Sequence, residues 1–185
     1  MVPIIHLNFL LLFLLIKISD TMKKILVLIT CLISIHALAS DTAKLYHPEA
    51  NVAKDVAGLL KKAKKENKNV MLQIGGNWCI WCYRFNDYVE TDKELKELLD
   101  KNYVVYHLNY SKENTNYNYL KKLGFPQRFG FPVFVILNPE GKVIHTQDSG
   151  LLEEGKGSTG YNKEKVKSFF QNWSTDAFNE AHYKE

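Results

Sequence analysis

The sequence predicts an α/β fold in which helices cover both faces of a mixed central sheet of about four to five strands. Three observations predict it. Helix-like and strand-like apolar patterns alternate along the chain, two late strand patterns are joined by a tight turn, and the composition suits one domain. The 185 residues are 46% hydrophobic and 24% charged, which is typical of a single globular domain with a short extension.

The charge of the chain argues against nucleic acid as a partner. The formal net charge is +4, and the first 24 residues contain three lysines against a single aspartate. The small excess that remains is interleaved with acidic residues. A nucleic-acid-binding surface needs basic residues gathered on one face. We therefore expect no nucleic-acid partner.

Residues 22–39 have the pattern of a secretory signal peptide. A basic pair precedes an eleven-residue apolar run, and Ala37 and Ala39 supply the small side chains that a signal peptidase needs before Ser40. We expect cleavage before Ser40 and an exported protein, periplasmic or secreted. Disulfides persist in such compartments.

The predicted signal peptide sets the bounds of the other segments of the chain. Residues 1–21 form an upstream apolar segment that is not translated if Met22 is the true start. Residues 40–51 form an N-terminal lead-in, and 52–185 form the folded domain. One alternative is an uncleaved membrane anchor made of both apolar stretches, although charged residues interrupt it. A lipoprotein modified at Cys31 is a further alternative.

Apolar periodicity predicts the elements of the domain. The helical patterns cover residues 52–63, 85–89, 95–99, 115–123 and 166–173. The strand patterns cover residues 70–74, 103–110, 133–137 and 142–146. Pro48 suits the first turn of the first helix. The resulting order is helix, strand, helix, strand, helix, strand, strand, helix, with the second helical region broken in two.

Two short motifs indicate where elements end. Thr91-Asp92-Lys93-Glu94 has the form of a capping box, in which the Thr and Glu side chains satisfy backbone N–H groups at a helix start. We therefore expect one helix to end and another to begin there. Asn138-Pro139-Glu140-Gly141 fits a tight turn and predicts a hairpin between the last two strands.

Two further motifs resemble the thioredoxin family. Trp78-Cys79-Ile80-Trp81-Cys82, placed between a strand and a helix, is similar to the family's Trp-Cys-x-x-Cys site. Gly130-Phe131-Pro132, just before a strand, matches its Gly-x-Pro with a cis proline. The resemblance runs from about Val52 to Trp173 and implies a thioredoxin-like fold.

The cysteine spacing suits thiol–disulfide exchange. Three residues apart at a helix start, the sulfurs of Cys79 and Cys82 lie on one face within bonding reach. Backbone N–H groups and the helix dipole favour a thiolate, so we expect the pKa of Cys79 to lie below the free value of about 8.5. We expect Cys79 to attack a substrate disulfide and the shielded Cys82 to release the reduced product.

The resemblance also implies a substrate-binding surface. Pro132 and the backbone of Phe131 would lie beside the cysteines and dock the substrate chain through strand-like hydrogen bonds. Trp78, Ile80 and Trp81 would form an apolar rim. Ordinary packing is the alternative for the tryptophans, and a trans proline at a strand start is the alternative for Pro132.

Departures from thioredoxin leave the direction of electron flow open. Gln73 stands where the family has a buried acid, and Ile-Trp separates the cysteines where thioredoxin has Gly-Pro. We expect an exported thiol–disulfide oxidoreductase that reduces protein disulfides. The alternatives are a disulfide oxidase or isomerase, or a non-catalytic thioredoxin-fold binding module in which the loop from Ser149 to Tyr161 holds a partner. A flexible connection is the plainer interpretation of that glycine-rich loop.

Two structural roles for Cys79 and Cys82 are less favoured. A zinc site usually needs four ligands, and the histidines show no ligand spacing: His47, His107, His145 and His182. An inert disulfide across so small a loop gains little stability. We expect no metal and no cofactor beyond the redox-active Cys79–Cys82 disulfide. The expected partners are protein disulfides and a redox partner protein, with a membrane only if the N-terminal segment is retained.

Overall fold

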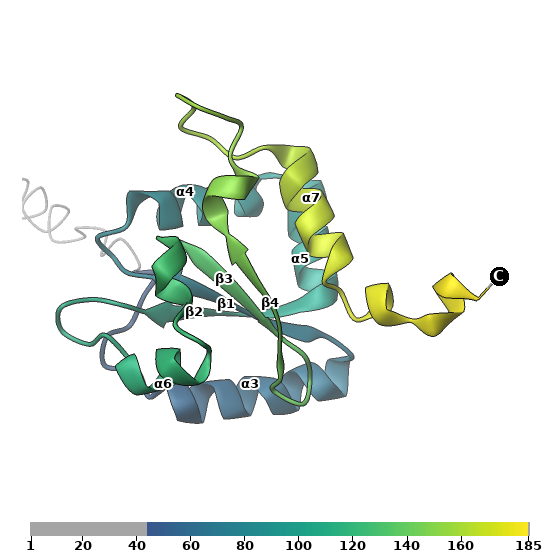
Figure 1. Cartoon of the computed structure of the whole chain (residues 1–185), viewed down its shortest axis with the longest axis horizontal. Coiled ribbons are helices and arrows are strands. Elements are labelled where there is room, and N and C mark those ends of the chain that lie inside the picture. The colour runs from purple at the N-terminus through teal and green to yellow at the C-terminus, as the bar shows by residue number, and fades with distance from the viewer. Residues whose placement is uncertain (1–43, 185) are drawn as a thin grey trace, which may run out of the picture. The chain divides into compact units, whose positions relative to one another are not determined.

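The structure is a computed structural model that describes residues 44–184 (Figure 1). The expected signal peptide and the segment before it lie outside the described residues. The helices are α3 (Val52–Glu66), α4 (Ile80–Thr91), α5 (Lys93–Asn102), α6 (Tyr117–Lys122) and α7 (Lys163–Asn172). The strands are β1 (Asn69–Gly75), β2 (Tyr103–Asn109), β3 (Val133–Leu137) and β4 (Val143–Asp148). Short 3-10 helices occupy Pro126–Phe129, Ser149–Leu152, Asp176–Phe178 and Glu180–Tyr183.

The four strands form one mixed sheet with the order β2-β1-β3-β4. β1 and β2 run parallel, and β3 runs antiparallel to both β1 and β4. A parallel pair needs a crossover connection, which α4 and α5 supply, whereas β3 and β4 are joined by a short turn. The predicted mixed sheet and the predicted order of helices and strands are confirmed, with four strands in the sheet.

Helices cover both faces of the sheet, with α3 and α6 on one side and α4, α5 and α7 on the other (Figure 1). β3 is buried along its whole length, as expected for a central strand covered on both faces. Alternate residues of β3 divide between the two cores, so that Phe134 and Ile136 face α4, α5 and α7. Within residues 44–184, no helix is long and apolar enough to cross a membrane.

The same alternation in β1 turns Gln73 toward α4. Met71 belongs to the core beneath α4, α5 and α7, whereas Leu72 and Ile74 belong to the core beneath α3 and α6. Because successive side chains of a strand point to opposite faces, Gln73 lies on the Met71 side. Gln73 is 1% exposed. A polar amide is thus buried where the helix that carries the cysteines packs on the sheet.

The break between α4 and α5 differs from the predicted capping box. Asp92, and not Thr91, caps α5, because its carboxylate accepts the N–H groups of Glu94 and Leu95 at 3.0 and 3.1 Å. The Thr91 hydroxyl instead donates to the Asp87 carbonyl at 2.7 Å within α4. The Glu94 carboxylate pairs with lysines of α7. The predicted break is confirmed, but the predicted Thr–Glu box is wrong, since an ionised carboxylate serves the positive helix end directly.

Helix α3 begins after Asn51 and not at Pro48. The Asn51 side chain accepts the Lys54 N–H at 3.1 Å and caps the helix. Pro48 precedes it in a turn closed by the Ala50 N–H. The prediction that Pro48 occupies the first helical turn is therefore wrong, because an Asn side chain that satisfies a free N–H group gives the stronger start signal.

Most elements differ from their predicted bounds by a few residues, and α6 and β4 are two examples. α6 is shorter than the predicted 115–123, and β4 extends beyond the predicted 142–146 to Asp148. Asn116 precedes α6 with a left-handed φ of 49°, a conformation that an α-helix cannot include. The helix therefore cannot begin as early as its apolar pattern suggested.

β1 ends where it packs closely against α4, and Gly75 makes this packing possible. A methyl group built at Gly75 would overlap the Cys82 sulfur and lie 2.9 Å from the Tyr46 hydroxyl. Both of these neighbours have no exposed surface. The missing side chain at Gly75 therefore lets the strand approach the start of α4 closely.

We expect Gly75→Ala to lower the free energy of unfolding by about 1–3 kcal/mol, because it overpacks a filled core. Urea denaturation of the oxidised proteins measures this change. Gly58→Ala in α3 is the matched control, since nothing lies within 4 Å of its added methyl group. The control should stabilise the protein by up to about 1 kcal/mol through helix propensity. An unchanged urea midpoint for Gly75→Ala would contradict the packing described.

Candidate active site

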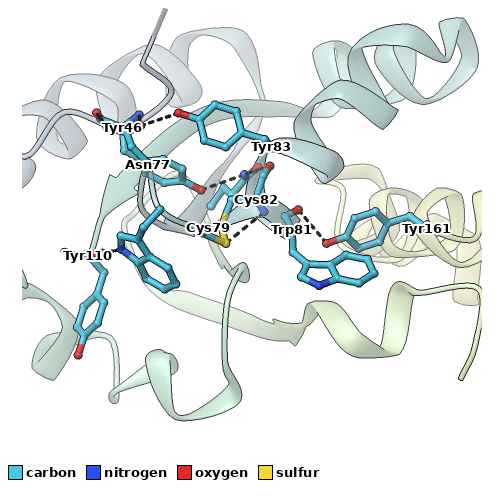
Figure 2. Close-up of a disulfide and its surroundings, with 10 residues drawn as sticks. Tyr46, Asn77, Cys79, Trp81, Cys82, Tyr83, Tyr110 and Tyr161 are labelled. Atoms are coloured by element: carbon cyan, nitrogen blue, oxygen red, sulfur yellow. Dashed lines mark hydrogen bonds between the residues drawn. A yellow bond between two sulfur atoms is a disulfide. The ribbon is translucent and has the colours of Figure 1, made fainter. Parts of the chain in front are cut away.

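Cys79 and Cys82 form a disulfide at the N-terminal end of α4, with their Cα atoms 5.3 Å apart (Figure 2). Cys79 is the N-cap of the helix, and Cys82 lies in its first turn. Cys79 is 4% exposed and Cys82 is 0% exposed. The structure brings the two cysteines together and shields Cys82 more completely.

The surroundings of the Cys79 sulfur favour negative charge. The Cys82 N–H donates to Cys79 Sγ at 3.2 Å. The sulfur also lies at the positive end of the dipole of α4. A thiolate accepts such a hydrogen bond more strongly than a neutral thiol does. The site therefore provides the stabilisation that a reactive thiolate at Cys79 needs.

A buried tyrosine and the amide of Gln73 lie behind Cys82. Gln73 Nε2 donates to the Tyr46 hydroxyl oxygen at 3.0 Å and to the Cys82 carbonyl at 3.1 Å. Burial raises the pKa of Tyr46 above the ordinary tyrosine range, so its hydroxyl stays protonated. Gln73 carries no ionisable group. It holds the Cys82 backbone in place, but proton transfer from the Cys82 thiol needs another acceptor.

Tyr46 is a site residue that sequence reasoning missed, because it lies in the predicted lead-in. It is fully buried and packs with both cysteines. Asn77 accepts the Tyr46 N–H at 3.0 Å and donates to the Tyr46 carbonyl at 2.8 Å. The Tyr83 hydroxyl donates to the same Asn77 oxygen at 2.9 Å (Figure 2). The available signal in the sequence was an aromatic residue in a short, mostly polar stretch.

Two residues of the predicted apolar rim, Trp78 and Ile80, form an exposed apolar surface together with the ring of Phe131. Trp78 and Ile80 are 58% and 60% exposed. Phe131 packs against the cluster that contains both cysteines and meets Trp78 edge to face, with ring centroids 5.2 Å apart. The Trp78 indole donates to the Tyr110 carbonyl at 2.8 Å, and the Tyr110 ring stacks on Phe131 at 4.9 Å. These contacts hold an aromatic surface next to the disulfide.

Pro132 lies directly after Phe131 and before β3. It is buried, and the Phe131–Pro132 peptide bond is cis, the isomer that the resemblance implies. Because Phe131 packs against the cysteine cluster, the turn that carries Pro132 lies next to the site.

Trp81 makes different contacts from the other rim residues. Its ring meets Tyr161 edge to face, with centroids 5.7 Å apart. The Arg84 guanidinium lies 4.9 Å above the Trp81 ring, in the arrangement of a cation–π contact. Trp81 is thus partly covered by side chains of the protein itself, and packing accounts for much of its surface.

The loop from Ser149 to Tyr161 is fixed at both ends. It begins with the 3-10 helix Ser149–Leu152, in which Leu152 is buried. Its last residue pairs with Glu153 in an isolated β-bridge and is 1% exposed. The exposed residues lie between these ends. The loop therefore places Tyr161 against α4, the helix that carries the cysteines. Sequence reasoning missed this role.

The described residues gather no donor set for a metal. Within residues 44–184, no three His, Cys, Asp or Glu side chains lie close enough to hold one.

His107 lies next to the site, where its ring packs edge to face on the ring of Tyr46, with centroids 5.5 Å apart. Burial, with a smaller effect of the His47 charge, lowers the pKa of His107 to about 4. His107 is therefore neutral near pH 7 and adds no positive charge to the site.

Three comparisons with known proteins show what this chain is similar to. A family model described as thioredoxin-like matches residues 50–139. A disulphide isomerase from Xylella fastidiosa Temecula1 has a similar structure, with a TM-score of 0.58 and 24% identity over 69% of this chain and 94% of that chain. The DsbD C-terminal domain of Neisseria meningitidis, in its oxidised form, gives a TM-score of 0.46 and 19% identity over 66% of this chain and 97% of that chain. No curated protein gives a significant match.

The family match covers the central part of the site but neither Tyr46 nor Tyr161. Residues 50–139 include both cysteines, Gln73 and Pro132. The isomerase structure supports the fold, at an identity of 24%. A cysteine pair that forms a disulfide at a helix start within this fold supports thiol–disulfide exchange. Residues 50–139 of this chain match a thioredoxin-like family model, and this stretch carries the cysteine pair of a thiol–disulfide oxidoreductase.

Proposed function

We propose that this protein is an exported thiol–disulfide oxidoreductase that reduces disulfides in other proteins. The observation that carries the proposal is the Cys79–Cys82 disulfide at the start of α4. The Cys82 N–H donates to the Cys79 sulfur at 3.2 Å, and Cys82 itself is fully buried. This arrangement supports unequal roles, in which Cys79 attacks and Cys82 resolves.

The reaction begins with the reduced protein. The Cys79 thiolate attacks one sulfur of a substrate disulfide, a mixed disulfide forms, and the other substrate sulfur leaves as a thiolate that takes a proton from water. Cys82 then loses its proton and attacks the Cys79 sulfur. The Cys79–Cys82 disulfide forms and the second substrate thiol is released. Two electrons and two protons pass overall from the protein dithiol to the substrate.

A second protein must return the pair to its dithiol form. Reduction of the Cys79–Cys82 disulfide needs two electrons and two protons. We assign this step to a redox partner protein that carries a dithiol of its own, because a dithiol reduces a disulfide by the same exchange chemistry. The active-site disulfide is then the only redox group that this chain needs.

The surroundings of Cys82 support reduction as the direction. Cys82 is enclosed with Tyr46, beside the neutral amide of Gln73. Burial away from water disfavours a thiolate. A stabilised reduced form makes a strong oxidant, so the stabilisation of the Cys79 thiolate alone favours oxidation. Cys82 adds no such stabilisation, and its contribution is the one that favours reduction.

The aromatic surface supports binding of an extended substrate segment. Trp78, Ile80 and Phe131 offer apolar contact area next to the sulfurs, and the backbone of Phe131 beside Pro132 would receive the substrate chain through strand-like hydrogen bonds. A pocket of about 430 Å³ opens beside this surface, lined by Trp78, Tyr110, Ser111, Lys112, Glu113 and Thr115. A substrate side chain next to the disulfide would fit there.

The two cysteine variants should fail in different ways. Cys79→Ser should form no mixed disulfide, because a serine hydroxyl is not ionised near neutral pH and Cys82 is shielded. Cys82→Ser should still attack but cannot resolve, so it should accumulate substrate-linked species that dithiothreitol releases. Nonreducing gels with exported proteins measure both outcomes. The Cys79→Ser Cys82→Ser double variant is the control for non-covalent association.

The asymmetry between the variants is the decisive result. Equal trapping by both single variants, or trapping by neither, would mean that the roles given to Cys79 and Cys82 are wrong.

The redox state of the pair in cells tests the direction. A reductase is kept ready by its donor, so we expect most of the exported protein to carry free Cys79 and Cys82 thiols. Acid quenching followed by alkylation with a polymer-linked maleimide counts the free thiols by gel shift. Samples treated with dithiothreitol or diamide give the two reference positions. A mostly disulfide-bonded protein would indicate an oxidant and reject the proposed direction.

Export predicts a new N-terminus. Residues 22–39 support cleavage before Ser40, so N-terminal sequencing of exported protein should begin at Ser40. Ala39→Leu is the matched variant, because a bulky side chain at this position blocks signal peptidase, and it should leave the precursor uncut. Exported protein that retains Cys31 or Met1 would overturn the cleavage proposal.

A further inference from the structure

One peptide group of the active-site helix is hydrogen-bonded at both ends. Its N–H, from Cys82, donates to Cys79 Sγ at 3.2 Å. Its carbonyl, from Trp81, accepts the Tyr161 hydroxyl at 3.2 Å. Figure 2 shows the two bonds on this peptide group, with Tyr161 reaching it from another part of the chain. A single peptide unit therefore connects Tyr161 to the Cys79 sulfur.

The Tyr161 hydroxyl is held as a donor. Tyr161 is 1% exposed and its ring packs edge to face on Phe85 at 5.0 Å and on Trp81 at 5.7 Å. Burial, aided by the Glu153 charge, raises the pKa of Tyr161 above the ordinary tyrosine range. The hydroxyl therefore keeps its proton, and because a carbonyl oxygen can only accept, Tyr161 donates to Trp81.

A donor on the carbonyl strengthens the hydrogen bond at the other end of the peptide group. Chains of hydrogen bonds polarise one another, and the effect is greater in a buried, low-dielectric site. The bond that gains most is the one to a charged acceptor. In the reduced protein, that acceptor is the Cys79 thiolate.

We propose that Tyr161 is a positioning residue that stabilises the Cys79 thiolate through the peptide group between Trp81 and Cys82. The inference rests on the proposed function, in which Cys79 is the attacking thiol. It assigns a role in thiol reactivity to the loop before α7, whose last residue, Tyr161, lies 80 residues from Trp81 in the sequence. Burial disfavours the charged Cys79 thiolate, and the hydrogen bond from Tyr161 favours it.

Other titratable and charged groups surround the site. They are Tyr46 before α3, His107 on β2, Tyr83, Arg84 and Tyr88 on α4, and Glu153 in the loop before α7. Tyr161→Phe changes none of these groups and keeps the packed ring. A change in the pKa of Cys79 in this variant therefore reports on the hydroxyl alone.

The test is the pH dependence of Cys79 alkylation in the reduced, full-length protein. Iodoacetamide reacts with the thiolate, and peptide mass spectrometry separates Cys79 from Cys82 and Cys31. In Tyr161→Phe we expect the pKa of Cys79 to rise by about half a unit, because polarisation strengthens a hydrogen bond by roughly 10–30%. At a pH below that pKa, alkylation should slow about threefold.

Tyr103→Phe is the matched control. Tyr103 is 3% exposed, belongs to the same core as Tyr161, and donates its hydroxyl to the Phe170 carbonyl at 2.8 Å. Its loss removes an equally buried tyrosine-to-carbonyl hydrogen bond that does not lead to a cysteine. Both variants should lower the urea midpoint of unfolding, but Tyr103→Phe should leave the pKa of Cys79 unchanged.

Two results would overturn the proposal: a wild-type pKa of Cys79 in Tyr161→Phe, or an equal rise in Tyr103→Phe. If Tyr161→Phe does not fold, 3-fluorotyrosine at position 161 replaces it. This side chain is a stronger donor of nearly the same size, so the pKa of Cys79 must fall, and any other result rejects the inference. Alkylation needs no protein substrate or electron donor. Failure of the Tyr161 inference can therefore be distinguished from failure of the proposed reductase activity.

Discussion

β1 and α4 meet at Gly75, where no side chain separates the strand from the Cys82 sulfur. The short distance lets Gln73, on the same face of β1, reach the Cys82 carbonyl at 3.1 Å. With the backbone of Cys82 held there, its N–H is directed at the Cys79 sulfur. The electrostatic stabilisation of Cys79, the shielding of Cys82 and the approach of Tyr46 all depend on this contact between strand and helix.

Two tyrosines from distant parts of the chain give the two sulfurs different surroundings. Tyr46, from the segment before α3, closes off Cys82 and shares a hydrogen bond with Gln73. Tyr161, from the loop before α7, acts on the peptide group whose N–H faces Cys79. Two cysteines three residues apart thereby experience different environments, and an exchange reaction with one attacking and one resolving thiol needs that difference.

Most of the fold and the cysteine pair were predictable because their signals are local. The apolar periodicity of β3 and α3, the turn from Asn138 to Gly141 and the Cys-x-x-Cys spacing each lie within a short stretch of sequence. The break between α4 and α5 was also predicted, but Thr91 and Asp92 are adjacent potential caps, and the cap is the carboxylate of Asp92, while the Thr91 hydroxyl bonds within α4. The contacts of Tyr46 and Tyr161 could not be predicted, since each joins residues far apart in the chain and no local pattern encodes such a pair.

The loop before α7 has a buried base and an exposed tip. Leu152 and Tyr161 are buried, and the bridge between Glu153 and Tyr161 closes the loop at its base. Doubling the length of a flexible loop costs only about 0.6 kcal/mol of closure free energy. Residues 154–160 can therefore change in length and sequence during evolution without displacing the Tyr161 hydroxyl. Selection for new partners can act on this edge of the site while the sulfur chemistry stays the same.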